Sequence, residues 1–344
     1  MALPPLDSIV DVNSEYTRTV IDSNRPLRVA TFNVERGYYL EKVLKELVIA
    51  DVDVLLLQEL DIACKRTGEV DVVKELAMAL NMGGVFITEF EELDDPVRGD
   101  RRAGGGVHGN AVLTRLPIRS NSSGFFRHSP QYDWETNGYS EGQPRGGGRV
   151  SLWIDIEVNK SIVRCVTTHL ENKCGILGRV RQFAEMLPTL FSVDGDSKSF
   201  DAMVIGGDLN TLNHGVVRFD FFSQPGDRLR FSTIGLSEAE WWSRNVFQTA
   251  DGRNLYNEID ELSDLKEGLT LAQRLRDPFD KTTGYTMDSQ TNWTLWARSF
   301  LYNGKLDWIL CTHGTDPLLT ISAKSIIETG GSDHCLLLVD FAMK

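Results

Sequence analysis

The sequence predicts an α/β fold in which helices and mixed β-sheets form a layered sandwich. Short apolar segments typical of strands alternate with amphipathic segments typical of helices along most of the chain. Some expected strands follow one another through a tight turn, whereas others are separated by a helix. This combination of hairpins and crossovers indicates mixed rather than purely parallel sheets. The chain has 344 residues, of which 41% are hydrophobic, enough to bury one large core.

The N-terminal part of the chain supplies the first strands and helices. Residues 1–26 contain several prolines and are expected to form an irregular N-terminal arm. Segment 27–34 (LRVATFNV) predicts a strand, and so does 52–60 (VDVLLLQEL), whose continuous apolar run is typical of a strand covered on both faces. In segments 40–50 and 72–80 the apolar residues recur at helical spacing, which predicts two amphipathic helices.

The rest of the chain continues this pattern. Further strands are expected at 110–115, 149–158, 161–170, 202–208, 305–312 and 335–341. Asn159 and Lys160 join two of them and predict a hairpin, and a helix is expected over about 177–190. Residues 213–303 are the least regular part and are rich in Trp and Phe, so they are expected to form an insertion-rich layer of helices and loops. No repeat or linker is evident, so residues 27–344 are expected to form a single domain.

Composition and charge exclude several classes of protein. The formal net charge is 36 − 49 = −13, so bulk charge does not attract nucleic acid or anionic lipid, and only local arginine clusters would do so. The five cysteines lack CxxC spacing, which favours reduced, buried thiols over disulfides or zinc. No signal-peptide pattern and no apolar stretch of about 20 residues is present, so the sequence predicts an intracellular, cytoplasmic protein without stable membrane insertion. The sequence does not predict an oligomeric state.

Small or titratable polar residues follow the expected strands, at or beside their ends. They are Asn33, Glu59, His169, Asp208, Asn210, Asp307, Asp333 and His334. Because α/β folds build their sites where strands end at one rim of a sheet, we expect these side chains to converge. Such an oxygen-rich cluster without thiols suits Mg²⁺ or Mn²⁺ rather than Zn²⁺.

The motifs around these residues resemble those of a known superfamily. In order, they are TFNV, QE, GNAVLTRLPI, THLE, GGDLNT, LDWIL and SDH, running from Thr31 to His334. Each is weak alone, but the ordered series is similar to that of the endonuclease/exonuclease/phosphatase superfamily, whose members share the DNase I-like fold. The resemblance implies a four-layered α/β sandwich with mixed β-sheets. It also implies hydrolysis of a phosphate ester that depends on a divalent metal.

The resemblance implies a role for each residue of the cluster. Glu59 would be the main metal ligand, with Asn33 on the metal or its water and Asp333 supporting the metal site. The ion would be Mg²⁺ or Mn²⁺. Hydrolysis spreads negative charge over the nonbridging phosphate oxygens, which a metal, an imidazolium and amide N–H groups all stabilise.

The remaining residues are expected to act on the substrate. Asp208 would deprotonate the attacking water and Asn210 would hold a phosphoryl oxygen. These two residues lie two apart on a segment expected to be extended, so both would face the same side, and Gly206 and Gly207 are expected to let the backbone approach the metal and water closely.

The two histidines are expected to contact the phosphate. His334 would contact the scissile phosphate, with Asp307 raising its pKa. His169 would donate to the phosphate or the leaving group. His108, His128, His214 and His313 have no comparable context, which favours surface or structural roles.

Structural explanations exist for each residue singly. Asp208 and Asn210 would also be explained by an Asx turn that closes the strand, and Asp307 and His334 by a buried structural pair. The ordered set of motifs nevertheless favours catalysis.

The substrate is less well determined by the sequence. Candidate phosphate-binding residues lie beside the motifs, the arginines on loops that include glycine-rich segments: Asn110, Arg145, Arg149 and Arg181. We therefore expect a phosphodiesterase acting on a nucleic acid or nucleotide-like diester. The alternatives are a sphingomyelinase-like or small-molecule phosphoesterase, with Trp241 and Trp242 either touching lipid or forming a buried aromatic cluster, and a catalytically silent binding scaffold.

Overall fold

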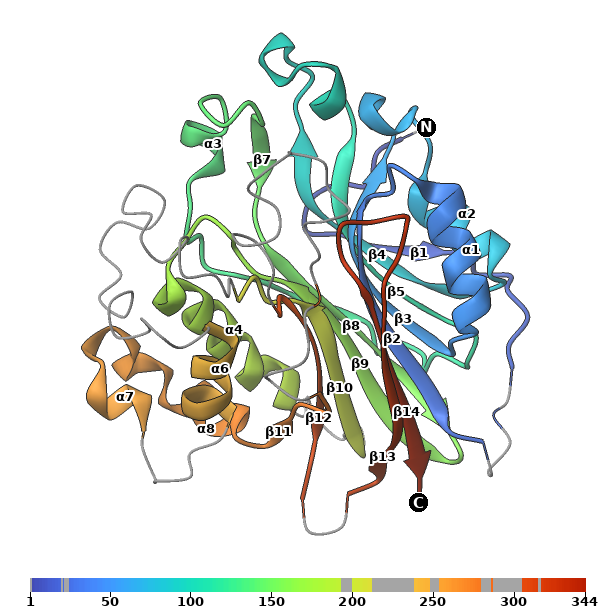
Figure 1. Cartoon of the computed structure of the whole chain (residues 1–344), viewed down its shortest axis with the longest axis vertical. Coiled ribbons are helices and arrows are strands. Elements are labelled where there is room, and N and C mark those ends of the chain that lie inside the picture. The colour runs from blue at the N-terminus through green and yellow to red at the C-terminus, as the bar shows by residue number, and fades with distance from the viewer. Residues whose placement is uncertain are drawn as a thin grey trace.

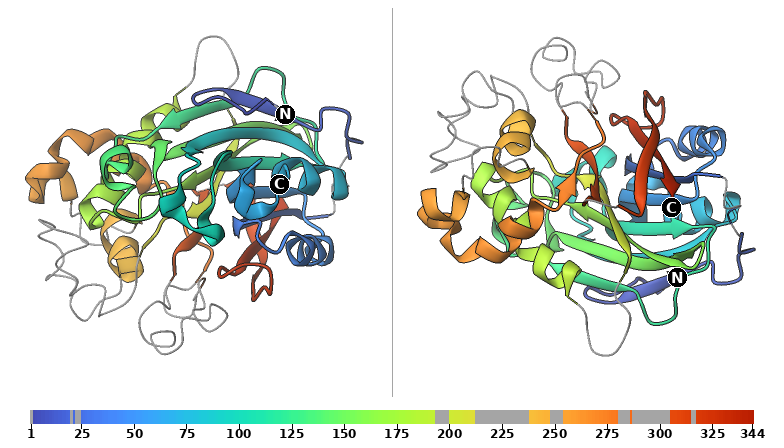
Figure 2. Two further views of the ribbon diagram at one scale, coloured as in Figure 1. Left: turned by 90° about the horizontal axis from the view of Figure 1, so that it is seen from above. Right: turned by 90° about the horizontal axis from the view of Figure 1, so that it is seen from below.

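Two mixed β-sheets pack face to face and carry helices on their outer faces, as the computed structural model shows (Figure 1). The structure describes residues 2–19, 21, 25–192, 200–211, 238–247, 254–279, 286, 305–314 and 317–344. Views from above and below show the helices on the two outer sides of the paired sheets (Figure 2). The prediction of a four-layered α/β sandwich with mixed sheets is confirmed.

The larger sheet has eight strands. In order across the sheet they are β1 (Ile9–Val12), β4 (Gly83–Glu92), β5 (Val107–Thr114), β3 (Val54–Ile62), β2 (Leu27–Arg36), β14 (Leu336–Met343) and β13 (Leu319–Ile327), with β7 (Arg145–Gly147) paired to β4. Strands β2 and β3 run parallel, whereas the other neighbours are antiparallel.

The second sheet has six strands. Their order is β11 (Leu275–Arg276), β12 (Asp307–Thr312), β10 (Ala202–Asp208), β9 (Ser161–His169), β8 (Val150–Val158) and β6 (Gly124–Arg127). Strands β9 and β10 are parallel, with helix α4 (Ile176–Phe191) between them in the chain. Strands β8 and β9 form the expected hairpin, in which Asn159 (φ 49°) and Lys160 (φ 70°) are both left-handed, as a tight hairpin turn requires.

Helices cover the outer face of each sheet. Helices α1 (Leu40–Ala50) and α2 (Val72–Ala79) pack on the larger sheet. Helices α4, α6 (Glu238–Trp242) and α8 (Lys266–Ala272) pack on the smaller one, with α7 (Leu255–Glu258) beside them. Shorter elements are helix α3 (Trp134–Asn137), a π-helical turn at Ser243–Phe247, and 3₁₀ turns at Lys65–Thr67, Pro96–Arg98, Asp100–Arg102 and Asp260–Leu265.

Strand β3 shows why the core has this arrangement. Its residues alternate between two cores: Leu55 and Leu57 face helices α1 and α2, whereas Val54 and Leu56 face the second sheet. Both faces are therefore covered, as the continuous apolar run predicted. In α1, Val43 and Leu47 are buried, whereas Val48, although apolar, is 60% exposed and lies outside the buried face of the helix.

The N-terminal arm is not irregular throughout. Residues Ile9–Val12 form β1, which pairs antiparallel with β4 and makes it an interior strand of the sheet. Strand β4 was not expected from the sequence, because Glu89 and Glu92 interrupt its apolar pattern. Both carboxylates are buried beside arginines, and these distant partners make the strand possible.

The described parts of the aromatic-rich segment lie on the helical layer. Residues 238–247 and 254–279 contain helices that pack against α4, and apart from Thr286 the rest of 213–303 lies outside the described residues. Trp241 and Trp242 are 6% and 0% exposed and belong to this core. The buried aromatic cluster is therefore confirmed, and a lipid-touching role for these two side chains is wrong. None of the described helices has the length and apolar character needed to cross a membrane.

Candidate active site

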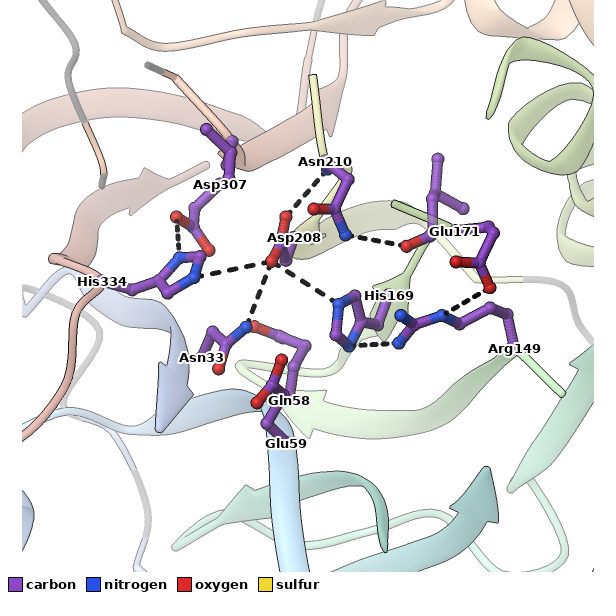
Figure 3. A network of polar contacts seen from close by, with 12 residues as sticks. Asn33, Gln58, Glu59, Arg149, His169, Glu171, Asp208, Asn210, Asp307 and His334 are labelled. Atoms are coloured by element: carbon purple, nitrogen blue, oxygen red, sulfur yellow. Dashed lines mark hydrogen bonds and ion pairs between the residues drawn. The ribbon is translucent and has the colours of Figure 1, made fainter. Parts of the chain in front are cut away.

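The predicted cluster forms where strands of the two sheets end side by side (Figure 3). Strands β2 and β3 each carry a bulge there, where the register shifts between Asn33 and Arg36 and between Leu57 and Leu60. Three non-glycine residues at the bulges, Glu35, Arg36 and Glu59, have left-handed φ angles of 46°, 64° and 58°. Such strain persists only where surrounding structure imposes it, and bulges re-aim side chains near functional sites.

Asp208 lies at the centre of the cluster (Figure 3). Its Oδ2 accepts a hydrogen bond from Asn33 Nδ2 (3.1 Å) and lies 3.6 Å from His169 Nε2 and 3.8 Å from His334 Nε2. Burial, the charge of Asp307 and that of Glu59 raise the pKa of Asp208 to about 7, against the opposing effect of His334. A carboxylate with a pKa near neutral is suited to accept a proton.

His334 is held by Asp307. His334 Nδ1 and Asp307 Oδ2 are 2.8 Å apart, and Asp307 is fully buried. Burial acts to lower the pKa of His334, but the charge of Asp307, its hydrogen bond and the charges of Asp333 and Asp208 raise this pKa well above its ordinary value. The direction of this shift agrees with the expected effect of Asp307 on His334, and it favours the charged imidazole.

Asn210 does not continue the extended strand. Strand β10 ends at Asp208, and Asn210 is left-handed (φ 50°), so the expectation that both residues face one side of an extended segment is wrong. The Asn210 backbone N–H donates to Asp208 Oδ1 (2.8 Å), which is an Asx turn, and Asn210 Nδ2 donates to Leu170 O (2.9 Å). Asn210 therefore forms the turn and also lies within the cluster.

The two glycines before Asp208 are required for the packing of strand β10. A Cβ on Gly206 would lie 2.6 Å from Leu56 Cδ1 of the opposite sheet, and one on Gly207 would lie 1.9 Å from Thr168 O of strand β9. The glycines let β10 come close to both neighbours, and this contact fixes the place of Asp208.

Gly207→Ala is therefore expected to lower the free energy of unfolding by about 1–3 kcal/mol, because the new methyl group overlaps a backbone carbonyl. Urea denaturation measures this change. Gly146→Ala is the matched control, since a Cβ there meets nothing within 4 Å, and it is expected to change stability little. Equal midpoints for the two variants would show that β10 does not need the glycine.

His169 is held by Arg149, a contact that sequence reasoning did not find. Arg149 Nη1 lies 2.9 Å from His169 Nδ1, and because a guanidinium can only donate, Nδ1 accepts and the proton sits on Nε2, facing Asp208. Burial and the charge of Arg149 hold the pKa of His169 well below its ordinary value. His169 is therefore a neutral N–H donor, and Arg149 is in turn held by Glu89 (3.3 Å) and Glu171 (3.5 Å).

Glu59 lies beside the cluster, partly exposed, with Arg36 as its nearest cation (3.7 Å). Although burial acts to raise it, the pKa of Glu59 is lowered by Arg36 and by nearby histidines, so Glu59 is ionised. Asp333 lies near the cluster too, 3.9 Å from His334 Nε2.

Glu35 was missed by the sequence analysis. Burial and the charges of Asp333 and Glu59 raise the pKa of Glu35 to about 7. Its place depends on the bulge, which no motif reveals.

The four candidate phosphate-binding residues differ in position. Arg149 contacts His169, as described above, and Arg145 is buried, with Nη2 donating to Gln143 Oε1 (2.8 Å). Asn110 is buried and donates to Glu89 and to Val150 O. The expectation that Arg181 lies on a loop is wrong. It lies in helix α4 and pairs with Asp264 of the helical layer (2.7 Å), because its position in the helix faces that layer.

The other histidines have structural surroundings where the structure describes them. His108 is buried with Nδ1 2.9 Å from Asp61, and His128 is buried between Gln182 O and Ser151 Oγ. His313 lies 3.1 Å from Gln273 O, and His214 lies outside the described residues.

Oxygen and imidazole donors in the cluster are close enough to share a cation. Asp208, Asp307 and His334 each offer an atom within 4.8 Å of the others, and all three are buried. Asp307 Oδ1 is buried and has no hydrogen-bond partner within the described part of the chain. Unpaired buried carboxylate oxygens are costly, and the raised pKa of His334 favours a positive charge that offsets part of this cost.

The model of the endonuclease/exonuclease/phosphatase family matches residues 30–334. The chain belongs to this family. The match spans every residue of the cluster, from Asn33 to His334. No curated protein matches the sequence significantly.

Solved structures of the same superfamily share the fold. An endonuclease/exonuclease/phosphatase from Beutenbergia cavernae superimposes with a TM-score of 0.56 at 16% identity, covering 93% of this chain and 72% of that one. ANGEL2, a 2′,3′-cyclic phosphatase in complex with adenosine-2′,3′-vanadate, gives 0.53 at 16% identity, covering 98% and 99%. TDP2 from D. rerio, complexed with a single-strand DNA product, gives 0.50 at 15% identity, covering 92% and 98%. At these identities the likeness establishes the fold alone.

Proposed function

We propose that the chain is a divalent-metal-dependent phosphodiesterase that hydrolyses a nucleic-acid or nucleotide-like diester. The observation that carries the proposal is the set of contacts around Asp208: a buried carboxylate with a pKa of about 7 lies within 4 Å of a neutral His169 and of the His334–Asp307 pair. The family match supports phosphate-ester hydrolysis. The nucleotide-like ligands named for ANGEL2 and TDP2 support the substrate class.

The residues supply the chemistry as follows. Asp208 Oδ2 takes a proton from a water molecule, whose oxygen bonds to phosphorus as the bond to the leaving oxygen breaks. The His334 imidazolium and the His169 Nε2–H donate to the phosphate oxygens or to the leaving oxygen, which gains a proton. Asn210 donates one N–H to Leu170 O, and its second N–H is available to a phosphoryl oxygen.

Glu59 is the best ligand for the metal, with Asp333 and the Asn33 amide beside it. The donors are oxygen atoms, which suit Mg²⁺ or Mn²⁺. His334 is close enough to share a cation with Asp208 and Asp307, but as an imidazolium it repels one, so we assign the ion to the Glu59 side. A bound divalent ion would neutralise charge on the phosphate oxygens.

Purified protein is expected to hydrolyse a diester in Mg²⁺ or Mn²⁺ and to lose this activity in EDTA. The substrates are single-stranded RNA, single- and double-stranded DNA, a sphingomyelin analogue and small phosphomonoesters, compared side by side. Cleavage of the sphingomyelin analogue or of monoesters alone would replace the proposed substrate class. Undiminished cleavage in EDTA would contradict metal dependence, and the absence of any hydrolysis, with unchanged thermal stability when metal is added, would favour a silent scaffold.

A further inference from the structure

Two arginines near Glu59, Arg36 and Arg145, have no role in the proposed chemistry. Arg36 Nη1 lies 3.7 Å from Glu59 Oε2, and its Nη2 donates to Gln143 Oε1 (3.4 Å). Arg145 Nη2 donates to the same oxygen (2.8 Å). Arg36, Gln143 and Arg145 therefore form one connected unit at the edge of the cluster, which we call the arginine subsite. The side chain of Arg36 is 21% exposed, so solvent reaches it.

The two arginines orient the amide of Gln143. Because both guanidinium groups donate to Oε1, the NH₂ group of the amide points away from them. Within the described part of the chain, Gln143 Nε2 has no acceptor, and the residue is partly exposed. Gln143 thus offers two N–H donors next to the Arg36 guanidinium.

Each arginine of the subsite faces one carboxylate at 3.7 Å, Glu59 for Arg36 and Glu92 for Arg145, and both guanidinium groups keep an unpaired Nε–H within the described part of the chain. Arg145 lies 3.9 Å from the Trp134 ring centroid, and its nearest carboxylate, Glu92, is 3.7 Å away and also pairs with Arg66 and Arg98. Burial and the charges of Arg149 and Arg36 lower the pKa of Arg145 to about 10, although Glu92 acts to raise it. The buried Nε atoms of Arg36 and Arg145 have no hydrogen-bond partner among the described residues. Such a group is stabilised by an added anion.

The backbone also holds Arg36 in place at some cost. Glu35 and Arg36 are consecutive left-handed residues in the bulge of β2, and neither is glycine. A regular strand would alternate their side chains across the sheet. The bulge instead leaves Arg36 in contact with both Glu59 and Gln143, so the local strain is linked to the position of this guanidinium.

We propose that the arginine subsite binds a second phosphate group of the substrate, distinct from the one that is hydrolysed. This inference rests on the proposed function and narrows it to diesters that carry another phosphate close to the scissile one. Arg36 and Gln143 donate hydrogen bonds to this second phosphate. Arg145, stacked on Trp134, donates to Gln143 and keeps its side chain in place. The second phosphate would be either a terminal phosphomonoester or the next diester of a nucleic-acid strand.

The test compares three substrates in Mg²⁺: thymidine 5′-(p-nitrophenyl phosphate), the same diester with a 3′-phosphate, and the 3′-methyl phosphate analogue. Wild type is expected to have a higher kcat/KM for one or both of the 3′-phosphorylated substrates than for the unphosphorylated diester. The better of these two shows whether the second phosphate is a terminal monoester or a neighbouring diester. In Arg36→Gln and in Gln143→Leu this preference is expected to fall about tenfold or more, the equivalent of at least about 1.4 kcal/mol. Arg115→Gln, which alters an exposed pair with Asp51, is the matched control and is expected to keep the preference.

A second readout separates this inference from the proposed function. Calorimetric titration of inorganic pyrophosphate in EDTA reports the subsite even where no substrate is cleaved. Arg36→Gln is expected to weaken this binding about tenfold, the equivalent of about 1.4 kcal/mol. An unchanged preference together with unchanged pyrophosphate affinity in both variants would overturn the inference. If Arg36→Gln fails to fold, Gln143→Leu, which alters one neutral side chain, decides the outcome by the same two measurements.

Discussion

Asp208→Asn is expected to lower kcat for diester hydrolysis by about 10²–10⁴-fold. The asparagine keeps the shape of the side chain and an oxygen toward the Asn210 N–H, but it cannot take a proton from water. Single-turnover hydrolysis in Mg²⁺ measures the loss without interference from product release. Asp51→Asn is the matched control: it removes a carboxylate in an exposed, left-handed position where asparagine is tolerated, and its rate is expected to equal that of wild type.

The same variant is expected to be more stable than wild type in EDTA. The folded-state pKa of Asp208 is raised to about 7, above its ordinary value near 4. Between these values the folded chain holds a proton that the unfolded chain has lost, so stability falls as pH rises through this window. Asparagine has no such titration, so the melting temperature of Asp208→Asn should exceed that of wild type above pH 7. A variant that is both inactive and less stable at that pH would indicate misfolding rather than lost proton transfer.

Much of the fold follows from local patterns. The helix at Leu40–Ala50 and the β8–β9 hairpin depend on periodicity and on turn residues, which are local properties, and both were predicted. Strand β4 was not predicted because its carboxylates are neutralised from far away in the chain: Glu89 by Arg149 and Glu92 by Arg66 and Arg98. Such pairing depends on the tertiary structure, so no window of sequence contains it.

The candidate site shows the same limit. Ordered motifs located Asp208, Asp307 and His334, because each motif places its residue at a strand end. Motifs do not show that Arg149 sets the tautomer of His169, nor that the bulge in β2 brings Arg36 to Glu59. These contacts arise where β2, β3, β8 and β9 meet. They determine the protonation and charge of the site residues, which a sequence motif does not specify.

Asp307→Asn is expected to lower kcat by about 10²–10⁴-fold without removing any group that touches the phosphate. The carboxylate accepts from His334 Nδ1 at 2.8 Å and raises the pKa of this imidazole well above its ordinary value. Without that charge the pKa of His334 is expected to fall, because burial is then opposed only by the charges of Asp333 and Asp208. NMR titration of His334 measures this change directly. Asp155→Asn, which breaks a pair with Arg164 in the same sheet, controls for general loss of stability and is expected to leave the titration unchanged.

The pH–rate profile of Asp307→Asn tests whether Asp307 acts on both partners at once. The charge of Asp307 raises the pKa of Asp208 as well as that of His334. Without the charge of Asp307, Asp208 ionises at lower pH, which shifts the acid limb of the profile to lower pH. His334 also loses its proton at lower pH, which shifts the alkaline limb in the same direction. The whole profile is therefore expected to shift to more acidic pH. If only the alkaline limb moved, Asp208 and Asp307 would not be electrostatically coupled. If neither limb moved, the Asp307–His334 pair would be structural, and the catalytic role of the imidazolium would have to be abandoned.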